Sequence, residues 1–273
     1  MRARDYTCTI LEVLWVTPSV LKVRFEPHKK FKYEPGQFLS IAIPSPSGKG
    51  KPTRRAYSFA LPFEVAKERG YELCVKYVPG GIGTGFLKSL RPGDRITVSA
   101  PYGDFVYKTP EEGRSVCFIS TGTGIAPFRS VVMSNHFKEN FPEQAFCVFG
   151  CRTAEEILYP GLFESLEVQT IYAISAPSPN WTGFRGRVTD YLKQLPNDWC
   201  WHTTDFYICG NAPMVMDVVK LLKGGHGVAD ASIYKEVFFE KRAKTRLPEN
   251  ATPTAVAIGD TDEEPTDSGS QAA

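Results

Sequence analysis

Residues 116–127 read VCFISTGTGIAP, and this stretch decides the fold of the second half of the chain. The apolar run 116–120 is typical of a buried strand, and residues 128–133 continue with helical spacing. Glycines at a strand-to-helix turn let a diphosphate approach the backbone, where the first N–H groups of the helix are unpaired. Because the full G-x-G-x-x-G pattern is absent, a plain tight turn would also explain these glycines.

Downstream of this unit, further apolar runs alternate with helical patterns, which is the signature of βαβ units on a parallel sheet. The runs cover residues 145–150, 170–174 and 206–209. The last run leads into a second strand-to-helix turn, where Asn211 is a candidate N-cap and Pro213 suits the first helical turn. Cys209 then lies at the carboxyl end of a parallel strand, where open α/β sheets bind ligands. Taken alone, this thiol is better explained as a buried, inert cysteine.

The first hundred residues contain short extended runs separated by turn residues such as Pro35-Gly36 and Pro92-Gly93-Asp94. The runs cover residues 8–13, 21–25, 38–43, 56–60, 71–78 and 95–99. Six strands at this spacing predict a small barrel or sandwich. The pattern changes near residues 108–113, which predicts a domain boundary there.

We therefore predict a two-domain fold followed by a tail. An antiparallel β-barrel covers residues 1–108, an α/β parallel-sheet domain covers 109–242, and the tail covers 243–273. From residue 247 onward the chain holds six carboxylates and no Lys or Arg, which leaves 32 basic residues against 24 acidic ones, a net charge of +8, on the rest. The tail has few large apolar side chains to offset the entropy of ordering it, so we expect it to be disordered.

The composition excludes several classes of protein. At 273 residues with 42% hydrophobic residues the chain can bury a core without disulfides or a structural metal. The seven cysteines are an odd number without any Cys-x-x-Cys pair, which favours reduced thiols and a cytoplasmic location and argues against an iron–sulfur cluster of the chain's own. We find no secretory signal and no apolar run long enough to span a membrane. Because the basic residues form no stripe, the sequence does not indicate nucleic-acid binding. It gives no indication of the oligomeric state.

Two stretches of the barrel half carry further chemistry. Residues 54–58 place two arginines, a tyrosine and a serine at the start of a strand, and residues 80–90 form a glycine-rich loop that enters a short helix. A guanidinium suits a phosphate, an aromatic ring can stack on a flat cofactor, and such a loop can hold a diphosphate. An edge strand with a solvated arginine face is the alternative. Two phosphate-type loops in two unlike domains suggest two nucleotides.

Together these motifs resemble the ferredoxin–NADP reductase superfamily of flavoproteins. Residues 55–58 match its R-x-Y-S/T flavin motif, residues 81–84 resemble its diphosphate loop, and residues 101–105 resemble the end of its barrel. The two nicotinamide-nucleotide motifs match residues 122–127 and 209–214, and residues 149–152 look like its G-x-R element. The resemblance runs from about residue 6 to residue 240, without a fused iron–sulfur domain.

The resemblance implies an enzyme with FAD in the barrel and NADH or NADPH at the parallel sheet. The implied catalytic residues are Ser58 near the flavin N5, Cys209 beside the nicotinamide, and Glu236 on the last strand. The implied ligands of FAD are Arg55, Ala56, Tyr57, Ser58, Gly81, Gly83, Thr84 and Phe238. Those of the nicotinamide nucleotide are Gly122, Thr123, Gly124, Ile125, Ala126, Pro127, Arg152, Cys209, Gly210, Pro213 and Met214. Because the chain continues beyond Phe239, whereas plant-type members end at the aromatic residue over the flavin, Phe238, Phe239 and Tyr234 all stay candidates for that contact.

The resemblance also implies transfer of hydride to FAD and of single electrons to ferredoxin, flavodoxin or another acidic or cluster-bearing partner. Candidate docking cations are Lys29, Lys30, Lys49, Lys51 and Arg54. Arg152, Arg185 and Arg187 are candidates for a ribose 2′-phosphate, but Ala176 stands where NADPH-preferring members often have arginine, which favours NADH. The alternatives are a flavin reductase that releases reduced flavin and an electron-transfer subunit that does not turn over alone.

Overall fold

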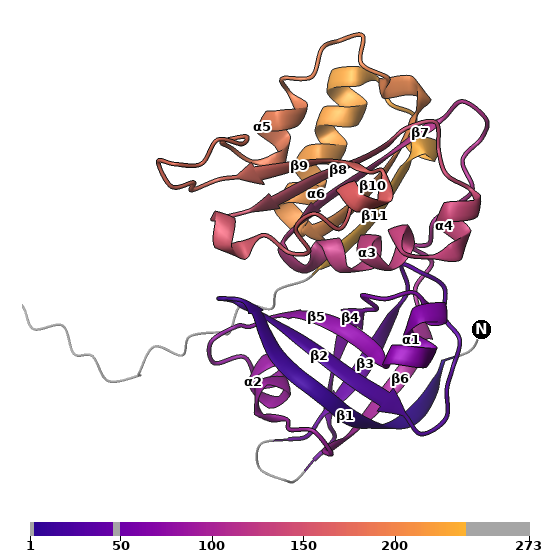
Figure 1. The fold of residues 1–273 in the computed structure, drawn as a ribbon, viewed down its shortest axis with the longest axis vertical. Coiled ribbons are helices and arrows are strands. Elements are labelled where there is room, and N and C mark those ends of the chain that lie inside the picture. The colour runs from indigo at the N-terminus through magenta and orange to yellow at the C-terminus, as the bar shows by residue number, and fades with distance from the viewer. Residues whose placement is uncertain (1–2, 46–49, 239–273) are drawn as a thin grey trace, which may run out of the picture. The chain divides into compact units, whose positions relative to one another are not determined.

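The computed structural model describes residues 3–45 and 50–238, which form two sheets (Figure 1). The predicted fold class is confirmed, since a six-stranded antiparallel sheet is followed by a five-stranded parallel sheet with helices. The predicted tail lies outside the described residues. Within the described residues, no helix combines the length and apolar composition that crossing a bilayer requires.

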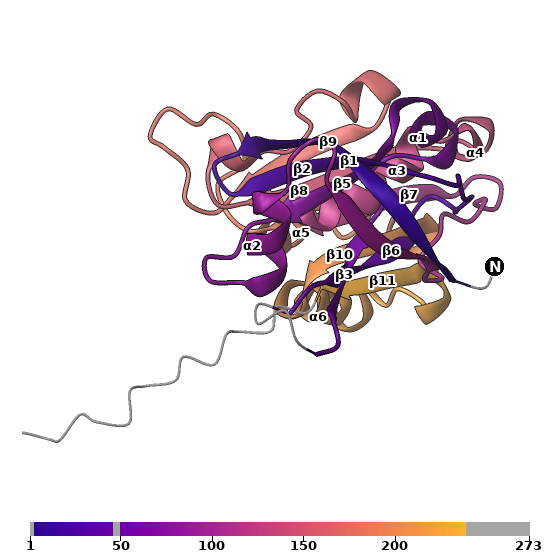
Figure 2. The ribbon, with the colours of Figure 1, turned by 90° about the horizontal axis from the view of Figure 1, so that it is seen from below.

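The first sheet curls into a barrel, in which β1, β2 and β5 lie side by side (Figure 2). Its strands are β1 (Arg4–Thr17), β2 (Val20–Pro27), β3 (Phe38–Ile43), β4 (Thr53–Ser58), β5 (Tyr71–Lys76) and β6 (Arg95–Tyr102), in the order β4-β3-β6-β1-β2-β5. A bridge between Phe59 and Leu73 brings the two edge strands together. Helices α1 (Phe63–Arg69) and α2 (Ile82–Ser89) complete this half.

The second sheet is entirely parallel, in the order β11-β10-β7-β8-β9. Its strands are β7 (Ser115–Thr121), β8 (Ala145–Cys151), β9 (Gln169–Ile174), β10 (Thr204–Asn211) and β11 (Ile233–Phe238), and its helices are α3 (Ala126–Val132), α4 (Asn135–Glu139), α5 (Val188–Leu192) and α6 (Ala212–Lys220). Alternation along β7 explains how both faces are covered: Phe118 packs with α3 and α4, whereas Cys117 and Ile119 pack with α5 and α6.

The turn between β7 and α3 is set by close backbone packing. Residues 122–125 form a short 3-10 helix, and a Cβ on Gly124 would lie 2.2 Å from the carbonyl oxygen of Cys209 on β10. Only glycine therefore fits at this position. At the neighbouring turn, Asn211 Oδ1 accepts a hydrogen bond from the backbone N–H of Met214 at 3.0 Å, which confirms Asn211 as the N-cap of α6.

The structure also corrects several strand boundaries, and the largest change is in β1, which spans Arg4–Thr17 instead of residues 8–13. The strand predicted at residues 56–60 ends at Ser58, because Phe59 turns into the barrel core and stacks on Tyr33. The strand predicted at residues 71–78 ends at Lys76, since Val78 bonds instead to the side chain of Thr84. Helix α1 was not predicted.

Candidate functional site

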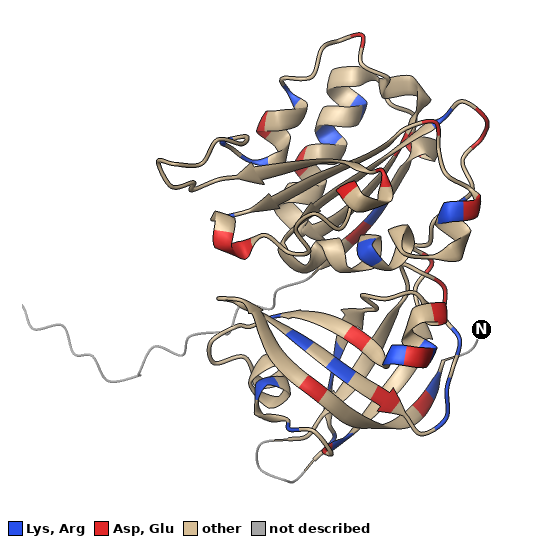
Figure 3. Ribbon diagram, viewed as in Figure 1, with Lys and Arg blue, Asp and Glu red and all other residues tan. Residues whose placement is uncertain are grey.

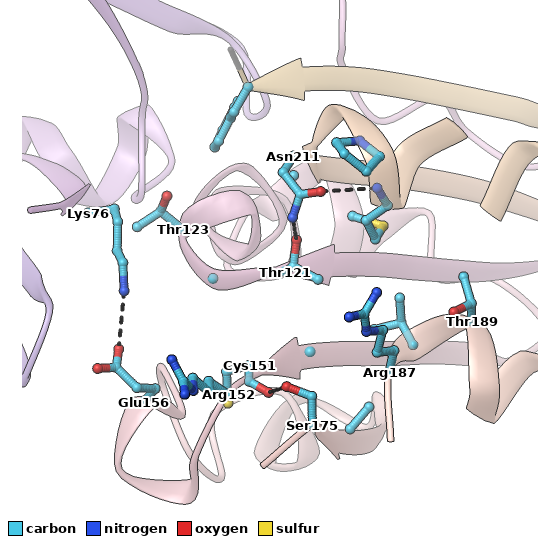
Figure 4. Close-up of a pocket in the computed structure, with 18 of the residues that line it drawn as sticks. Lys76, Thr121, Thr123, Cys151, Arg152, Glu156, Ser175, Arg187, Thr189 and Asn211 are labelled. Carbon is cyan, nitrogen blue, oxygen red and sulfur yellow. Dashed lines mark hydrogen bonds and ion pairs between the residues drawn. The ribbon is translucent and has the colours of Figure 1, made fainter. Parts of the chain in front are cut away.

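The carboxyl ends of the parallel strands border a cavity of about 700 Å³ (Figure 4). Strand ends and the turns that follow them supply most of its walls, and the barrel adds Val20 and Lys76. The lining from the second half is Thr121, Gly122, Thr123, Gly150, Cys151, Arg152, Thr153, Glu156, Ala173, Ser175, Arg187, Val188, Thr189, Gly210, Asn211, Pro213, Met214, Asp217 and Phe238. This is the edge where open α/β sheets bind ligands.

Three turns that contain glycine, at Gly122, Gly150 and Gly210, line one side of this cavity and leave room for a dinucleotide. Backbone at Gly122, Gly150 and Gly210 lines the cavity, so a ligand can approach the main chain closely. Between the turns, Asn211 Nδ2 donates to Thr121 Oγ1 at 3.3 Å. The hydroxyl of Ser120, the residue before this turn, is fully buried and has no hydrogen-bond partner among the described residues.

Two arginines provide positive charge in the cavity. Arg152 and Arg187 both line it, and neither forms an ion pair among the described residues. Figure 4 shows Lys76 facing Glu156 at one end, with Arg187 farther along; the Lys76 ammonium lies 3.8 Å from the Glu156 carboxylate. Arg185 does not line the cavity, since its guanidinium donates to the carbonyl oxygens of Pro179 and Trp181 at 2.7 and 2.6 Å.

A second group of residues joins the barrel to the last strand. Ser58, at the end of β4, donates its hydroxyl to the Glu236 carboxylate on β11 at 3.3 Å. Glu236 pairs in register with Cys209 on β10, and a Cβ on Gly103 would lie 3.9 Å from the same carboxylate. The three predicted catalytic residues therefore lie on adjoining segments.

Burial changes the acid–base behaviour of this group. Burial raises the pKa of Glu236 to about 7, although the hydrogen bond from Ser58 opposes the shift. Cys209 is fully buried, and burial together with the charge of Glu236 raises the pKa of its thiol well above the usual value. Cys209 is therefore a neutral thiol near neutral pH, whereas Glu236 can gain or lose a proton there.

The flavin motif lies against the start of α2. A Cβ on Gly83 would lie 2.9 Å from Arg55 Cγ and 3.4 Å from the Tyr57 hydroxyl, so glycine lets the loop reach the motif. Thr84 Oγ1 donates to the Val78 carbonyl oxygen at 3.1 Å and accepts from the Val78 N–H at 3.2 Å, which fixes the turn. Burial raises the pKa of Tyr57 to about 12, so its ring stays neutral. A guanidinium beside a helix N-terminus fits a diphosphate.

The predicted site residues thus fall into three places. Those in the cavity are Gly122, Thr123, Arg152, Gly210, Pro213, Met214 and Phe238. Those on the barrel are Arg55, Ala56, Tyr57, Ser58, Gly81, Gly83 and Thr84. Gly124, Ile125, Ala126, Pro127 and Cys209 are buried beneath the turns and do not line the cavity.

The aromatic residues of β11 lie in different places. Phe238 lines the cavity, whereas Tyr234 stacks on Tyr207 with ring centroids 4.6 Å apart. Phe239 lies outside the described residues.

Sequence reasoning missed several cavity residues, among them Lys76, Glu156, Thr189 and Asp217. The position of Lys76 at the end of a strand, just before a Pro-Gly-Gly turn, was a usable signal. For Glu156 there was none, because its contacts with Thr17, Ser19 and Lys76 join segments far apart in the sequence.

Comparison with protein families gives a match to each half. Residues 8–107 match the oxidoreductase FAD-binding domain, and residues 118–220 match the oxidoreductase NAD-binding domain.

Individual relatives agree with this. A ferredoxin–NADP reductase B from Sorangium cellulosum is 28% identical over 247 residues, which cover 86% of this chain and 98% of that protein. The reductase component DmpP of a phenol 2-monooxygenase from a Pseudomonas species is 27% identical over 244 residues, which cover 86% of this chain and 66% of that protein. The crystal structure of the Amycolatopsis cytochrome P450 reductase GcoB superposes with a TM-score of 0.75 at 26% identity, covering 86% of this chain and 70% of that one.

Proposed function

Because this chain belongs to the ferredoxin–NADP reductase superfamily and is an NAD(P)H-dependent FAD oxidoreductase, we propose that it passes electrons singly to a separate acidic electron-transfer protein. Ferredoxin and flavodoxin are the partners of this kind that we propose. The observation that carries the proposal is a basic hollow on the barrel, lined by Lys29, Lys30 and Lys32, because its lining also includes Pro101, two residues before the Gly103 that lies beside Glu236.

The chain's own residues have distinct roles in this proposal. Bound FAD supplies the ability to accept two electrons together and release them one at a time. Arg55 and the Gly81–Thr84 loop hold its diphosphate, and Tyr57 offers a neutral ring for stacking. Ser58 and Glu236 form a hydrogen-bonded pair beside the flavin that can hold a proton at the carboxyl group near neutral pH.

Cys209 acts as a positioning residue for the nicotinamide nucleotide in this proposal. Its thiol is buried and neutral, so it supports the cavity floor rather than attacking a substrate. The predicted ligands of the nucleotide are those of the glycine turns and Arg152.

We propose NADH as the preferred coenzyme. Arg185 is occupied by its own loop and Ala176 carries no charge, which leaves Arg152 and Arg187 as cations for a 2′-phosphate. The carboxylate of Asp217 also lines the cavity and opposes an additional dianion there, whereas the charges of Glu156 and Lys76 offset each other in an ion pair.

A basic hollow on the barrel supports the docking of an acidic partner. This hollow is lined by the basic residues Arg4, His28, Lys29, Lys30 and Lys32 and by the acid Asp5, and its volume is about 590 Å³. Pro101 also lines it and leads through Tyr102 to Gly103, beside Glu236, so a partner in the hollow would lie close to the flavin. Figure 3 shows acidic residues interspersed with basic ones on the barrel strands, so the excess of positive charge in the hollow is local.

The other predicted docking cations contribute less to this hollow. Arg54 is 3.3 Å from the Asp5 carboxylate, Lys51 is exposed outside the hollow, and Lys49 lies outside the described residues. We therefore propose Lys29 and Lys30 as the docking cations, of which Lys30 also lies 3.7 Å from the Glu26 carboxylate. The cytoplasmic location expected from the cysteines stays a prediction.

The test is NADH-dependent reduction of a purified [2Fe–2S] ferredoxin, with free FMN as a second acceptor. We expect Lys29→Glu/Lys30→Glu to slow ferredoxin reduction by about tenfold at low salt, and the difference to shrink at high salt. Ferricyanide reduction should be unchanged, which controls for coenzyme binding and flavin content. Rapid reduction of free FMN without any reduction of ferredoxin or flavodoxin would replace this proposal with that of a flavin reductase.

A further inference from the structure

Arg129 lies where the barrel meets the parallel sheet. It is on α3, one turn after the glycine-rich loop, and its guanidinium contacts the Glu72 carboxylate of β5 at 2.5 Å. The side chains of Arg129 and Glu72 are only 15% and 7% exposed. Because such a pair is costly to bury, it needs further partners to be stable.

Those partners come from both halves of the molecule. Arg129 also donates to the carbonyl oxygen of Ala60 at 3.2 Å, two residues beyond Ser58. Its guanidinium carbon lies 4.3 Å from the centre of the Tyr159 ring, which adds a cation–π contact. Tyr159 has φ 54°, a left-handed conformation that non-glycine residues rarely adopt, so the surrounding contacts hold it there.

The segments that carry Arg129, Ala60 and Glu72 each lead to a proposed ligand site. Helix α3 follows the turn that contains Gly122, Ala60 follows the flavin motif, and β5 leads to Lys76 and the Gly81–Thr84 loop. The Arg129 guanidinium is therefore bonded to the segment that follows the flavin motif, at Ala60, and to the strand that precedes the diphosphate loop, at Glu72. Arg129 itself is on the helix that follows the turn containing Gly122. A small displacement there would move the two ligand sites relative to each other.

We propose that the Arg129–Glu72 ion pair is a positioning element that sets the distance between the nicotinamide and the flavin. This inference rests on the proposed function. Neither residue lines the cavity, so the pair acts through the segments it joins. Hydride transfer is sensitive to misplacement of the reacting atoms by as little as an ångström, which makes such a link matter for rate.

A matched control exists within the second domain. Arg114 contacts Asp205 at 2.6 Å, and their side chains are 19% and 13% exposed, which is close to the burial of the proposed pair. Both lie at the amino ends of β7 and β10, at the opposite edge of the sheet from the cavity. Arg114→Met therefore removes a comparable ion pair, and the further bonds of Arg114 to His202 and Ser232 also lie just before β10 and β11, away from the cavity.

The experiment compares Arg129→Met, Glu72→Met, the double variant and Arg114→Met in the FAD-loaded protein. In anaerobic stopped-flow we expect Arg129→Met to lower the limiting rate of flavin reduction by NADH by at least about tenfold, with FAD content unchanged. The NADH concentration that gives half of this rate should change by less than about threefold, because the nucleotide ligands are intact. Arg114→Met should lower the thermal midpoint but leave the rate within about twofold of the wild type.

The double variant separates positioning from stability. The double variant leaves no buried unpaired charge, so its thermal midpoint should be higher than that of either single variant. Its limiting rate of flavin reduction should nevertheless stay low. Amide hydrogen exchange in the FAD-free protein should be faster in both β5 and α3 in Arg129→Met but not in Arg114→Met.

Several results would overturn the inference: a normal rate in Arg129→Met, an equal loss in Arg114→Met, or a rate that recovers with stability in the double variant. Wild-type protein that neither nucleotide reduces would instead overturn the proposed function.

Discussion

At the scale of single residues, burial decides the chemistry at the junction of the two domains. Glu236 and Cys209 lie side by side on adjacent strands, and both pKa values are raised because burial disfavours the charged forms. The carboxyl group is the one that titrates near neutral pH, with a pKa of about 7. Replacing either side chain should therefore have a measurable effect.

Glu236→Gln should change the pH dependence of stability. Folding raises the pKa of Glu236 from 4.5 to about 7. Between pH 4.5 and about pH 7 the folded protein therefore binds more protons than the unfolded protein, so the free energy of unfolding falls as pH rises. Glutamine mimics the neutral carboxyl group, so the variant should gain about 1–3 kcal/mol of unfolding free energy at pH 8 and nothing at pH 4. Urea unfolding of the FAD-free protein at both pH values measures this, and an equal effect at the two would contradict it.

Cys209→Ala should keep the flavin but slow its reduction by NADH by about tenfold or more, because the cavity floor that positions the nicotinamide loses the packing of this buried side chain. Cys117→Ala is the matched control, since Cys117 is equally buried but packs on the opposite face of the sheet with α5 and α6. Stopped-flow reduction rates distinguish the two variants. If Cys209→Ala is reduced at the wild-type rate, Cys209 has no part in the mechanism.

At the scale of elements, the strand-to-helix turns build the site, because their glycines let the turns approach neighbouring backbone or side chains closely. The turn after β7 lies directly on the carbonyl group of Cys209, and the start of α2 lies directly on Arg55. The position of each ligand loop therefore depends on contacts with a strand or motif elsewhere in the chain.

Gly124→Ala should disrupt this packing. The added methyl group would lie 2.2 Å from the Cys209 carbonyl oxygen, so the turn must move, at a cost of about 1–3 kcal/mol in stability. We also expect NAD⁺ to bind at least about tenfold more weakly, because the backbone N–H groups at the turn are displaced. Gly224→Ala, where a Cβ meets open space, is the control. Calorimetric titration with NAD⁺ checks both, and equal affinities in the two variants would refute this role of the turn.

At the scale of the whole molecule, local patterns predicted the two sheets because each relies on short-range periodicity. Alternation and turn residues located the barrel strands, and continuous apolar runs located the parallel strands. Phe59 shows the limit of this reasoning, since its turn into the core depends on Tyr33, which no local pattern reveals.

Contacts between distant segments were equally inaccessible from sequence. The link of Arg129 to Glu72 spans 57 residues, and that of Ser58 to Glu236 spans 178. The motifs named Ser58 and Glu236 individually, but only the fold places them within hydrogen-bond distance. Arg129 belongs to no motif that we recognised, so it emerged from the structure alone.

Every role assigned above depends on a bound FAD that accepts electrons from a nicotinamide nucleotide. An anaerobic titration of the purified protein with NADH and, separately, with NADPH, followed across the flavin absorbance bands, measures this electron transfer. We predict a stoichiometrically bound flavin that bleaches at a much lower concentration of NADH than of NADPH. A colourless protein that reduces only added flavin, or a bound flavin that neither nucleotide bleaches, would contradict the account.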